Sequence, residues 1–436
     1  MHWSLAFAAF LLYIFVTVSY KLPLGTGEVA MAVALLTLPL ERTRFAVSPV
    51  VAWSAALLAW ASFGLITSSY PAIVADNLRD FAKVCAIMLV TVNVITTRSR
   101  LRIFILFFLA TFLLFPVRGA FHMQFTAGGV GMGRAGWVGS YGNSNDLATF
   151  CLLQLALVFA FIAAEPNRWL RYAVAGEILV LPLLIAFTGS RAGTIASAAF
   201  CLIAFGKRLW KPKTLLGLGA VAVLVSIVVP HALFNRISTI DDISDASSGA
   251  SKESSSDLMA AQGSTAERLE IWKVAAAIVR DNPAMGVGLG AYSVAHGQYA
   301  MQPQFTARGN RDAHSTYLRL AAELGIPGLG CFLGLVAATL IEAERVRRQA
   351  RRLLPKRAAE LGYLEIGLIA YLVAGIWASL GMYVFTYLQL TILHVTARLL
   401  RSELQQAQSV TPGTPQRPTA VGRFAAGLKS MPVAHR

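Results

Sequence analysis

One histidine in the second half of the chain combines a possible proton acceptor with a helical pattern. The stretch RDAHSTYLRLAAELGIPG, residues 311–328, predicts a short helix with His314 at its N-terminal end. The positive end of a helix dipole disfavours imidazolium, so we expect a neutral imidazole near pH 7. Such a group can accept a proton from a hydroxyl. A capping or interfacial histidine is the alternative. Arg319 and Glu323 are spaced i,i+4, and we expect them to form a supporting ion pair and not to act in catalysis.

Three arginines stand where an anion would stabilise them. Arg191, in FTGSRAGT, lies at the edge of an apolar run, where a guanidinium is costly unless it meets an anion or water. Arg268 falls in the first turn of a predicted helix, whose dipole already favours anions. Arg134 lies in the Gly-rich stretch GVGMGRAGWVGSYGNSNDLA, where backbone can approach a ligand. Because a guanidinium donates two parallel hydrogen bonds to phosphate oxygens, the three together predict a phosphate site.

Each of these features also has a simpler interpretation. Arg191 can extend to the membrane interface, Arg268 can pair with a nearby carboxylate, and Arg134 can be a solvated loop charge. The glycines of NPAMGVGLGAY lack the strand–turn–helix context of a dinucleotide site. We therefore expect a flexible turn there, at which a lipid-linked sugar can approach the backbone.

The elements that must position these residues are membrane helices. Of 436 residues, 56% are hydrophobic and 14% charged, and mean hydropathy is +0.60. These values are typical of polytopic membrane proteins, and the apolar runs predict about twelve transmembrane helices. The net charge of +16 falls largely on the short segments assigned to the inner side. The charge therefore indicates topology and contact with membrane lipids rather than nucleic-acid binding.

The predicted organisation is an all-α polytopic membrane protein with one large outer loop. Residues 1–230 hold about nine helices, with a periplasmic loop at about 118–146. Residues 231–324 form the large periplasmic loop, which has a flexible Ser-rich part followed by short helices. Residues 325–400 hold the last three helices, and residues 401–436 form a disordered cytoplasmic tail.

Within the large loop, one amphipathic helix is predicted in detail. Ser264 and Glu267 have capping-box spacing and mark its start. The residues expected on its apolar face are Leu269, Trp272, Ala276 and Val279. Such a helix lies either on the bilayer surface or against the protein's own core.

Taken in order, the motifs resemble the signatures of the O-antigen ligase and O-antigen polymerase superfamily. TGSRAG is similar to an SR at a membrane edge, and RLEIWKVAAAIVRDNPAMGVGLGAY to an R-x-x-x-W helix followed by an NP-x-x-G-x-G turn. AHSTYLRLAAELGIPGLG is similar to an H-(N/S)-x-Y-L helix followed by E-x-G-x-x-G. RAGWVGSYGNSNDLA resembles an upstream R…G…N-x-N-x-x-A element. The resemblance extends over about residues 134–330.

The resemblance implies a membrane glycosyltransferase of the C-type architecture in surface polysaccharide biosynthesis. Such an enzyme works in the bacterial inner membrane, with both termini cytoplasmic and the active site periplasmic. Its donor is a polyprenyl-diphosphate-linked glycan, with Arg191 and Arg268 at the diphosphate and His314 at the acceptor hydroxyl. Arg134 and Asn145 are implied as supporting residues. This chain has HS where many members have HN, which changes the expected partner of the histidine but not its role.

The expected reaction needs no metal and no cofactor, because two arginines can neutralise a diphosphate leaving group. The acceptor is left open between a glycan, a lipid A core and a protein hydroxyl. A polytopic transporter or exporter of a lipid-linked or polar solute is the alternative from another class, although paired half-repeats are not evident. A catalytically inactive scaffold is a third interpretation.

Overall fold

Every element of regular structure described by the computed structural model is a helix. The description covers residues 4–23, 25–41, 45–130, 133–206, 211–228 and 255–410. Within these ranges, the strand-like pairing is one isolated antiparallel bridge between Val130 and Arg134. The α-helices are α1 Leu5–Ser19, α2 Thr26–Thr37, α3 Pro49–Ser62, α4 Gly64–Thr67, α5 Pro71–Val94, α6 Arg98–Phe112, α7 Arg118–Ala127, α8 Ser144–Ala164, α9 Arg168–Ala175, α10 Glu177–Phe187, α11 Arg191–Phe205, α12 Pro212–Val228, α14 Ser255–Asp281, α15 Tyr292–Tyr299, α16 Thr316–Ala350, α17 Pro355–Ala374 and α18 Val384–Val410.

Several helices are apolar and long enough to cross a membrane. Five helical stretches meet both criteria: Pro49–Thr67, Arg98–Ala127, Ser144–Ala164, Arg168–Phe187 and Thr316–Ala350. Shorter apolar helices accompany them among the described residues. The expected all-helical chain with membrane spans is thus confirmed, whereas the number of about twelve crossings stays a prediction.

The predicted periplasmic loop at 118–146 begins with helix instead. Helix α6 passes through a π-helical turn at Leu113–Val117, with Pro116 inside it, and continues as α7 to Ala127. A proline removes one backbone donor, and the wider turn lets the helix bend without ending. The irregular backbone that carries Arg134 is therefore shorter than the sequence suggested.

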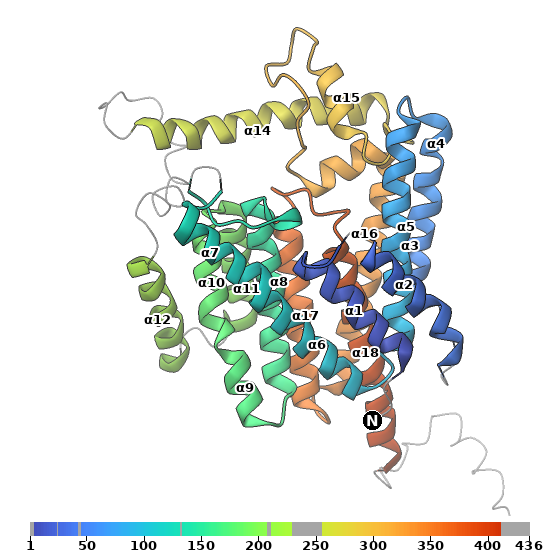
Figure 1. Cartoon of the computed structure of the whole chain (residues 1–436), viewed down its shortest axis with the longest axis vertical. Helices are drawn as coiled ribbons and strands as arrows, with labels where there is room; N and C mark the ends of the chain where they lie inside the picture. The colour runs from blue at the N-terminus through green and yellow to red at the C-terminus, as the bar shows by residue number, and fades with distance from the viewer. Residues whose placement is uncertain are drawn as a thin grey trace, which may run out of the picture.

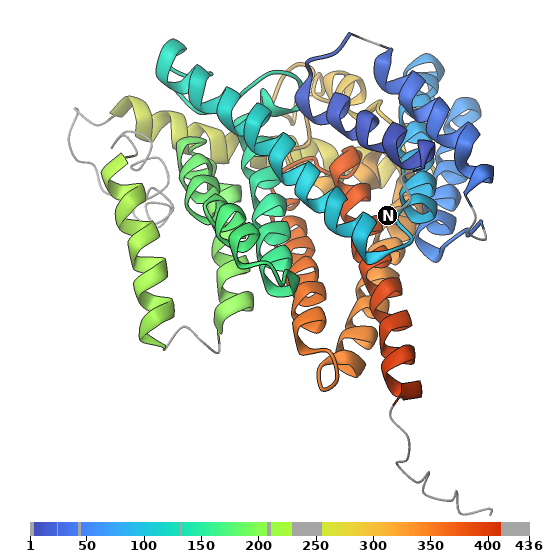
Figure 2. The same cartoon turned by 60° about the horizontal axis from the view of Figure 1, so that its bottom comes forward.

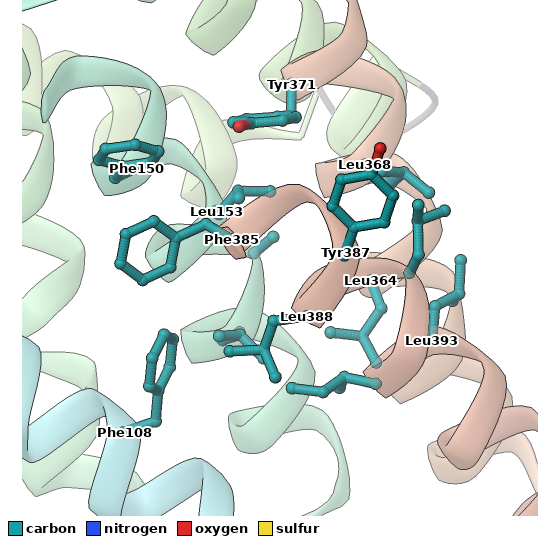
Figure 3. Close-up of a cluster of buried hydrophobic side chains, with 14 of the residues drawn as sticks. Phe108, Phe150, Leu153, Leu364, Leu368, Tyr371, Phe385, Tyr387, Leu388 and Leu393 are labelled. Carbon is teal, nitrogen blue, oxygen red and sulfur yellow. The ribbon is translucent and has the colours of Figure 1, made fainter. Parts of the chain in front are cut away.

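A buried aromatic core joins α8, α17 and α18 (Figure 3). The rings of Phe150 on α8 and Phe385 on α18 have centroids 4.6 Å apart. A Cβ on Gly367 of α17 would lie 2.2 Å from the Cβ of Ala156, so the backbones of α17 and α8 approach closely. This packing fixes the start of α8, which carries Asn145, against the start of α18.

One end of the bundle is held by ion pairs between segments that the sequence assigned to the inner side. Arg98 pairs with Glu360 at 3.0 Å and with Glu403 at 2.7 Å. Arg102 pairs with Glu165 at 2.6 Å. Residues from four separate parts of the chain thus meet at one end of the bundle.

The opposite end of the bundle carries α14 and α15, and α14 lies across the ends of the other helices (Figures 1 and 2). Val274, Ala275 and Ile278 of α14 are fully buried. They pack in a second, smaller core with Tyr292 of α15 and Phe305. Of the two arrangements considered for this helix, its C-terminal half therefore adopts packing on the protein's own core.

The start of α14 differs from the prediction, and the residues that the helix buries are not those of the predicted apolar face. The helix begins at Ser255, so Ser264 lies inside it and is not an N-cap. Leu269, expected on the apolar face, is 53% exposed. Helical spacing alone could not identify the buried face, because a second apolar stripe runs along α14 through Val274 and Ile278.

The two segments predicted as flexible lie largely outside the described residues. These are the Ser-rich part of the large loop and most of the C-terminal tail. Helix α18 itself runs to Val410, past the tail boundary predicted at residue 401.

Candidate active site

Helix α14 contacts the histidine segment directly through its tryptophan. The indole Nε1 of Trp272 donates to the backbone carbonyl of Ala313, at 3.0 Å, and Ala313 precedes His314. Arg268 lies one turn before Trp272 on the same face of α14. Its charge also acts on the His314 imidazole. The R-x-x-x-W spacing thus positions an arginine beside the histidine.

The prediction that Arg268 lies in the first turn of its helix is wrong. Helix α14 starts at Ser255, so Arg268 is near the middle of the helix, more than three turns from its N-terminus. The helix dipole acts within the first turn and cannot contribute there. What places Arg268 at this site is the docking of Trp272.

His314 itself precedes helix α16 rather than starting it. Ser315 is the N-cap, and the first helical residue is Thr316. The backbone of His314 is left-handed, with φ of 46°, which is uncommon for a residue with a side chain. Its amide N–H donates to Asp312 Oδ2 at 3.0 Å, which stabilises this conformation.

The electrostatics around His314 favour a neutral imidazole. Burial lowers its pKa from the usual value, as the largest cause. Arg268 and Arg311 lower this pKa further, while Asp312 acts in the opposite direction. The pKa of His314 is thus lowered, as expected, although the main cause is burial of the imidazole and not the dipole of α16.

Asp312 is a residue that the sequence reasoning missed. Besides the His314 amide, it accepts from Ser379 Oγ at 2.7 Å and pairs with Arg319 Nη1 at 3.2 Å. Its Oδ2 lies 3.5 Å from His314 Nδ1. An acidic residue two positions before a candidate base was the available signal, because a carboxylate there can orient the ring.

The supporting ion pair of the same helix is found as expected. Arg319 Nε donates to Glu323 Oε1 at 2.9 Å, and Glu323 is fully buried. Because Arg319 also contacts Asp312, the pair connects the helix to the histidine segment. A buried carboxylate needs such a partner.

Arg134 and Asn145 form a second group at the same end of the molecule. Arg134 Nη2 donates to Asn145 Oδ1 at 2.8 Å, and Arg134 Nε donates to the carbonyl of Thr188 at 2.6 Å. Thr188 belongs to the TGSR turn, in which Gly189 has a φ of 56°. Arg191 follows as the first residue of α11 and is half-buried. The structure thus brings three of the predicted site residues to one turn.

A connection between α17 and α18 links the two groups. Tyr383 donates to Asp146 Oδ2, at 2.7 Å, and Asp146 follows Asn145. Ser379 of the same connection donates to Asp312 beside His314. Asp312 is also close enough to act electrostatically on Asp146. The Arg134 group and the His314 group therefore share one set of contacts.

The NP-x-x-G-x-G turn is docked against α16 instead of being a flexible approach for a ligand. The amides of Val287 and Gly288 donate to the carbonyls of Ala322 and Glu323, at 2.8 and 2.9 Å. These carbonyls are available because α16 is kinked at Gly325, whose φ is 70°. The glycine turn and the E-x-G motif thus bind each other, and their shared role is to hold the outer helices on the membrane bundle.

A comparison with known protein families agrees with this arrangement. Residues 176–333 match the family model described as O-antigen ligase. This part of the chain is therefore similar to the O-antigen ligase family and is called the O-antigen ligase-like domain below. The resemblance to the O-antigen ligase and polymerase superfamily is thereby confirmed over this part of the chain. No curated protein matches the chain.

The O-antigen ligase-like domain contains Arg191, Arg268 and His314, and also the Trp272 contact that brings α14 to the histidine. It begins after Arg134 and Asn145, which join it through the TGSR turn. The match supports a function of the O-antigen ligase or polymerase type in general, for which lipid-linked glycan and acceptor are the kinds of partner.

Proposed function

We propose that the protein transfers a polyprenyl-diphosphate-linked glycan to an acceptor hydroxyl at the periplasmic face of the bacterial inner membrane. In this proposal it crosses the membrane about twelve times, in a C-type glycosyltransferase architecture with both termini in the cytoplasm. The observation that carries the proposal is the contact of Trp272 with Ala313, which joins the R-x-x-x-W helix to His314 inside the O-antigen ligase-like domain.

His314 acts as the base in the proposed reaction. It accepts the proton of the acceptor hydroxyl while the oxygen attacks the anomeric carbon of the donor glycan. The bond from that carbon to the diphosphate oxygen breaks, and the polyprenyl diphosphate leaves with the electron pair. Attack from the opposite side inverts the anomeric configuration. The lowered pKa of His314 keeps the imidazole ready to accept the proton.

Arg191 and Arg268 bind the diphosphate and neutralise the charge that develops as it leaves. Arg134 and Asn145 support Arg191 by holding the TGSR turn, as the hydrogen bond from Arg134 to Thr188 suggests. Since guanidinium groups provide this neutralisation, the proposed transfer needs no divalent metal.

Asp312 is a positioning residue in this mechanism. It lies 3.5 Å from His314 Nδ1 and accepts from the His314 amide. A carboxylate on one ring nitrogen leaves the other nitrogen to accept the proton and stabilises the imidazolium that forms.

Reconstitution tests the proposal directly. Purified protein in vesicles would be given a polyprenyl-diphosphate-linked oligosaccharide in the presence of a metal chelator, and products would be analysed by gel and mass spectrometry. A ladder of longer lipid-linked glycans indicates a polymerase, and a single transfer to an added lipid or protein acceptor indicates a ligase. Movement of intact donor across the vesicle membrane without any transfer would contradict the proposal.

A further inference from the structure

An open groove of about 780 Å³ runs between α14 and residues 306–311. Its volume falls within the roughly 300–1,000 Å³ of pockets that bury small ligands. Leu269, Trp272, Lys273 and Ala276 line it from α14. Three of these four are the residues that the sequence placed on the apolar face of the helix. The predicted apolar face of α14 therefore forms one wall of the groove.

Four of the five charged residues that line the groove form two ion pairs, and the fifth, Arg308, donates to the backbone carbonyls of Ala300 and Gln302. Lys273 Nζ lies 2.6 Å from Glu270 Oε1, and Arg311 Nη2 lies 3.2 Å from Glu267 Oε1. Glu270 also contacts Thr306 on the opposite wall. Paired charges offer hydrogen-bond donors and acceptors without a large net field. Such a surface suits a neutral polyhydroxyl ligand better than a polyanion.

The apolar part of the groove suits the same ligand. The indole N–H of Trp272 is already used by Ala313, so the ring presents its apolar surface to the groove. Sugar rings combine apolar C–H faces with hydroxyl groups at their edges. An aromatic face beside paired carboxylate, ammonium and guanidinium groups matches both features.

One wall of the groove is attached to the histidine segment. Trp272 lines the groove and also holds the residue before His314. Glu267 and Arg311 line the groove and act on the pKa of His314. His314 itself does not line the groove, so an acceptor bound there would extend past the residues that border the histidine segment to reach the imidazole.

We propose that this groove binds sugar residues of the acceptor and directs the acceptor hydroxyl to His314. This inference rests on the proposed function, because it assigns the acceptor side of the same site. The diphosphate of the donor is bound elsewhere, at Arg191 and Arg268.

Filling the groove tests the proposal. Ala276 is exposed on α14 and lines the groove, so Ala276→Trp blocks it without removing a contact. Arg280 is exposed on the same helix outside the groove, and Arg280→Trp is the matched control. In the reconstituted assay we expect Ala276→Trp to raise the KM for the acceptor by about tenfold or more, with the KM for the donor unchanged. Lys273→Ala, at an exposed side chain, should give a smaller rise in the same constant.

Direct binding separates this proposal from the proposed function. The probes are the free oligosaccharide released by mild acid from the cells' lipid-linked donor and the delipidated core oligosaccharide of the same cells, titrated calorimetrically. We expect at least one of them to bind the wild-type and Arg280→Trp proteins and not Ala276→Trp. If transfer proceeds while Ala276→Trp leaves the acceptor KM unchanged or raises the donor KM instead, the groove assignment is wrong and the proposed function stands. If glycan binds the groove but the wild-type protein transfers nothing, the groove stands as a saccharide site and the proposed reaction fails. Binding of neither probe by the wild-type protein would overturn the groove assignment.

Discussion

The two halves of the candidate site differ in the groups to which the guanidiniums of Arg134 and Arg319 donate in the contacts described above. At the TGSR turn, Arg134 donates to neutral oxygens, the carbonyl of Thr188 and the amide of Asn145. Around His314, Arg319 pairs with the carboxylates of Asp312 and Glu323. A neutral acceptor orients a guanidinium without cancelling its charge, whereas a carboxylate does both.

We therefore assign anion binding and proton transfer to different regions of the candidate site. In the proposed mechanism, the turn that carries Arg191 binds the diphosphate. The His314 region balances charge around a half-buried imidazole and suits proton transfer. Arg268 is proposed to bind the diphosphate, and its charge also lowers the pKa of the His314 imidazole. The predictions that follow separate anion binding from proton transfer.

Loss of the imidazole should have the largest effect. His314→Ala removes the proposed base, so we expect transfer to fall by about 100- to 10,000-fold. The amount of inserted protein should be unchanged, because His314 precedes α16 and is only half-buried. Transfer rates and membrane protein levels are measured together. A variant with near-normal turnover would remove the base from the mechanism.

Replacing the guanidinium of Arg191 by an ammonium group should have the next largest effect. Arg191→Lys keeps the charge and loses the bidentate geometry, so transfer should fall by roughly 10- to 100-fold if one charged hydrogen bond of ~1.5–3 kcal/mol is lost. The loss should appear mainly in the KM for the donor. Equal donor KM in Arg191→Lys and the wild-type protein would mean that the turn does not bind the diphosphate.

Loss of the hydrogen bond from Arg134 to Asn145 should have a smaller effect on transfer. Asn145→Ala removes one hydrogen bond to the guanidinium, and we expect the donor KM to rise by about tenfold or less. The matched control is Asn143→Ala, because Asn143 is the neighbouring asparagine that caps α8 by accepting from the Asn145 amide. That control should lower stability by about 1 kcal/mol without changing the donor KM. Similar kinetics in the two variants would mean that Asn145 has only a structural role.

The smallest expected effect is a change in pH dependence. Asp312 raises the pKa of His314 against the larger lowering by burial, so Asp312→Asn should lower this pKa further. Because the neutral imidazole is the active form, the acid limb of kcat against pH should move to lower pH. Ser379→Ala removes a partner of Asp312 but keeps its charge, and should leave that limb in place. A shift toward higher pH in Asp312→Asn would contradict this account of the electrostatics.

Sequence spacing predicted the helical membrane fold and the ion pair of Arg319 with Glu323, because both follow from local periodicity. The family resemblance implied Arg134 and Asn145 as supporting residues, and the structure brings these two into contact. Their roles in the reaction stay predictions until they are measured.

Other features depend on contacts between distant segments, which spacing does not contain. The position of Arg268 comes from Trp272 docking on Ala313, and the sequence attributed it to a helix start that lies elsewhere. Asp312 was missed because its partners Ser379 and Arg319 meet it only after folding. The sequence predicts a flexible glycine turn, because the kink at Gly325 that exposes carbonyls to the turn forms only in the folded protein.

The most direct test of the central claim is donor binding in two variants. Affinity for a polyprenyl-diphosphate-linked glycan would be measured for the wild-type protein, His314→Ala and Arg191→Ala in lipid nanodiscs. The account predicts that His314→Ala binds the donor as the wild-type protein does while transferring none of it, and that Arg191→Ala loses affinity. Unchanged affinity in Arg191→Ala, or an equal loss in His314→Ala, would contradict the separation of anion binding from proton transfer.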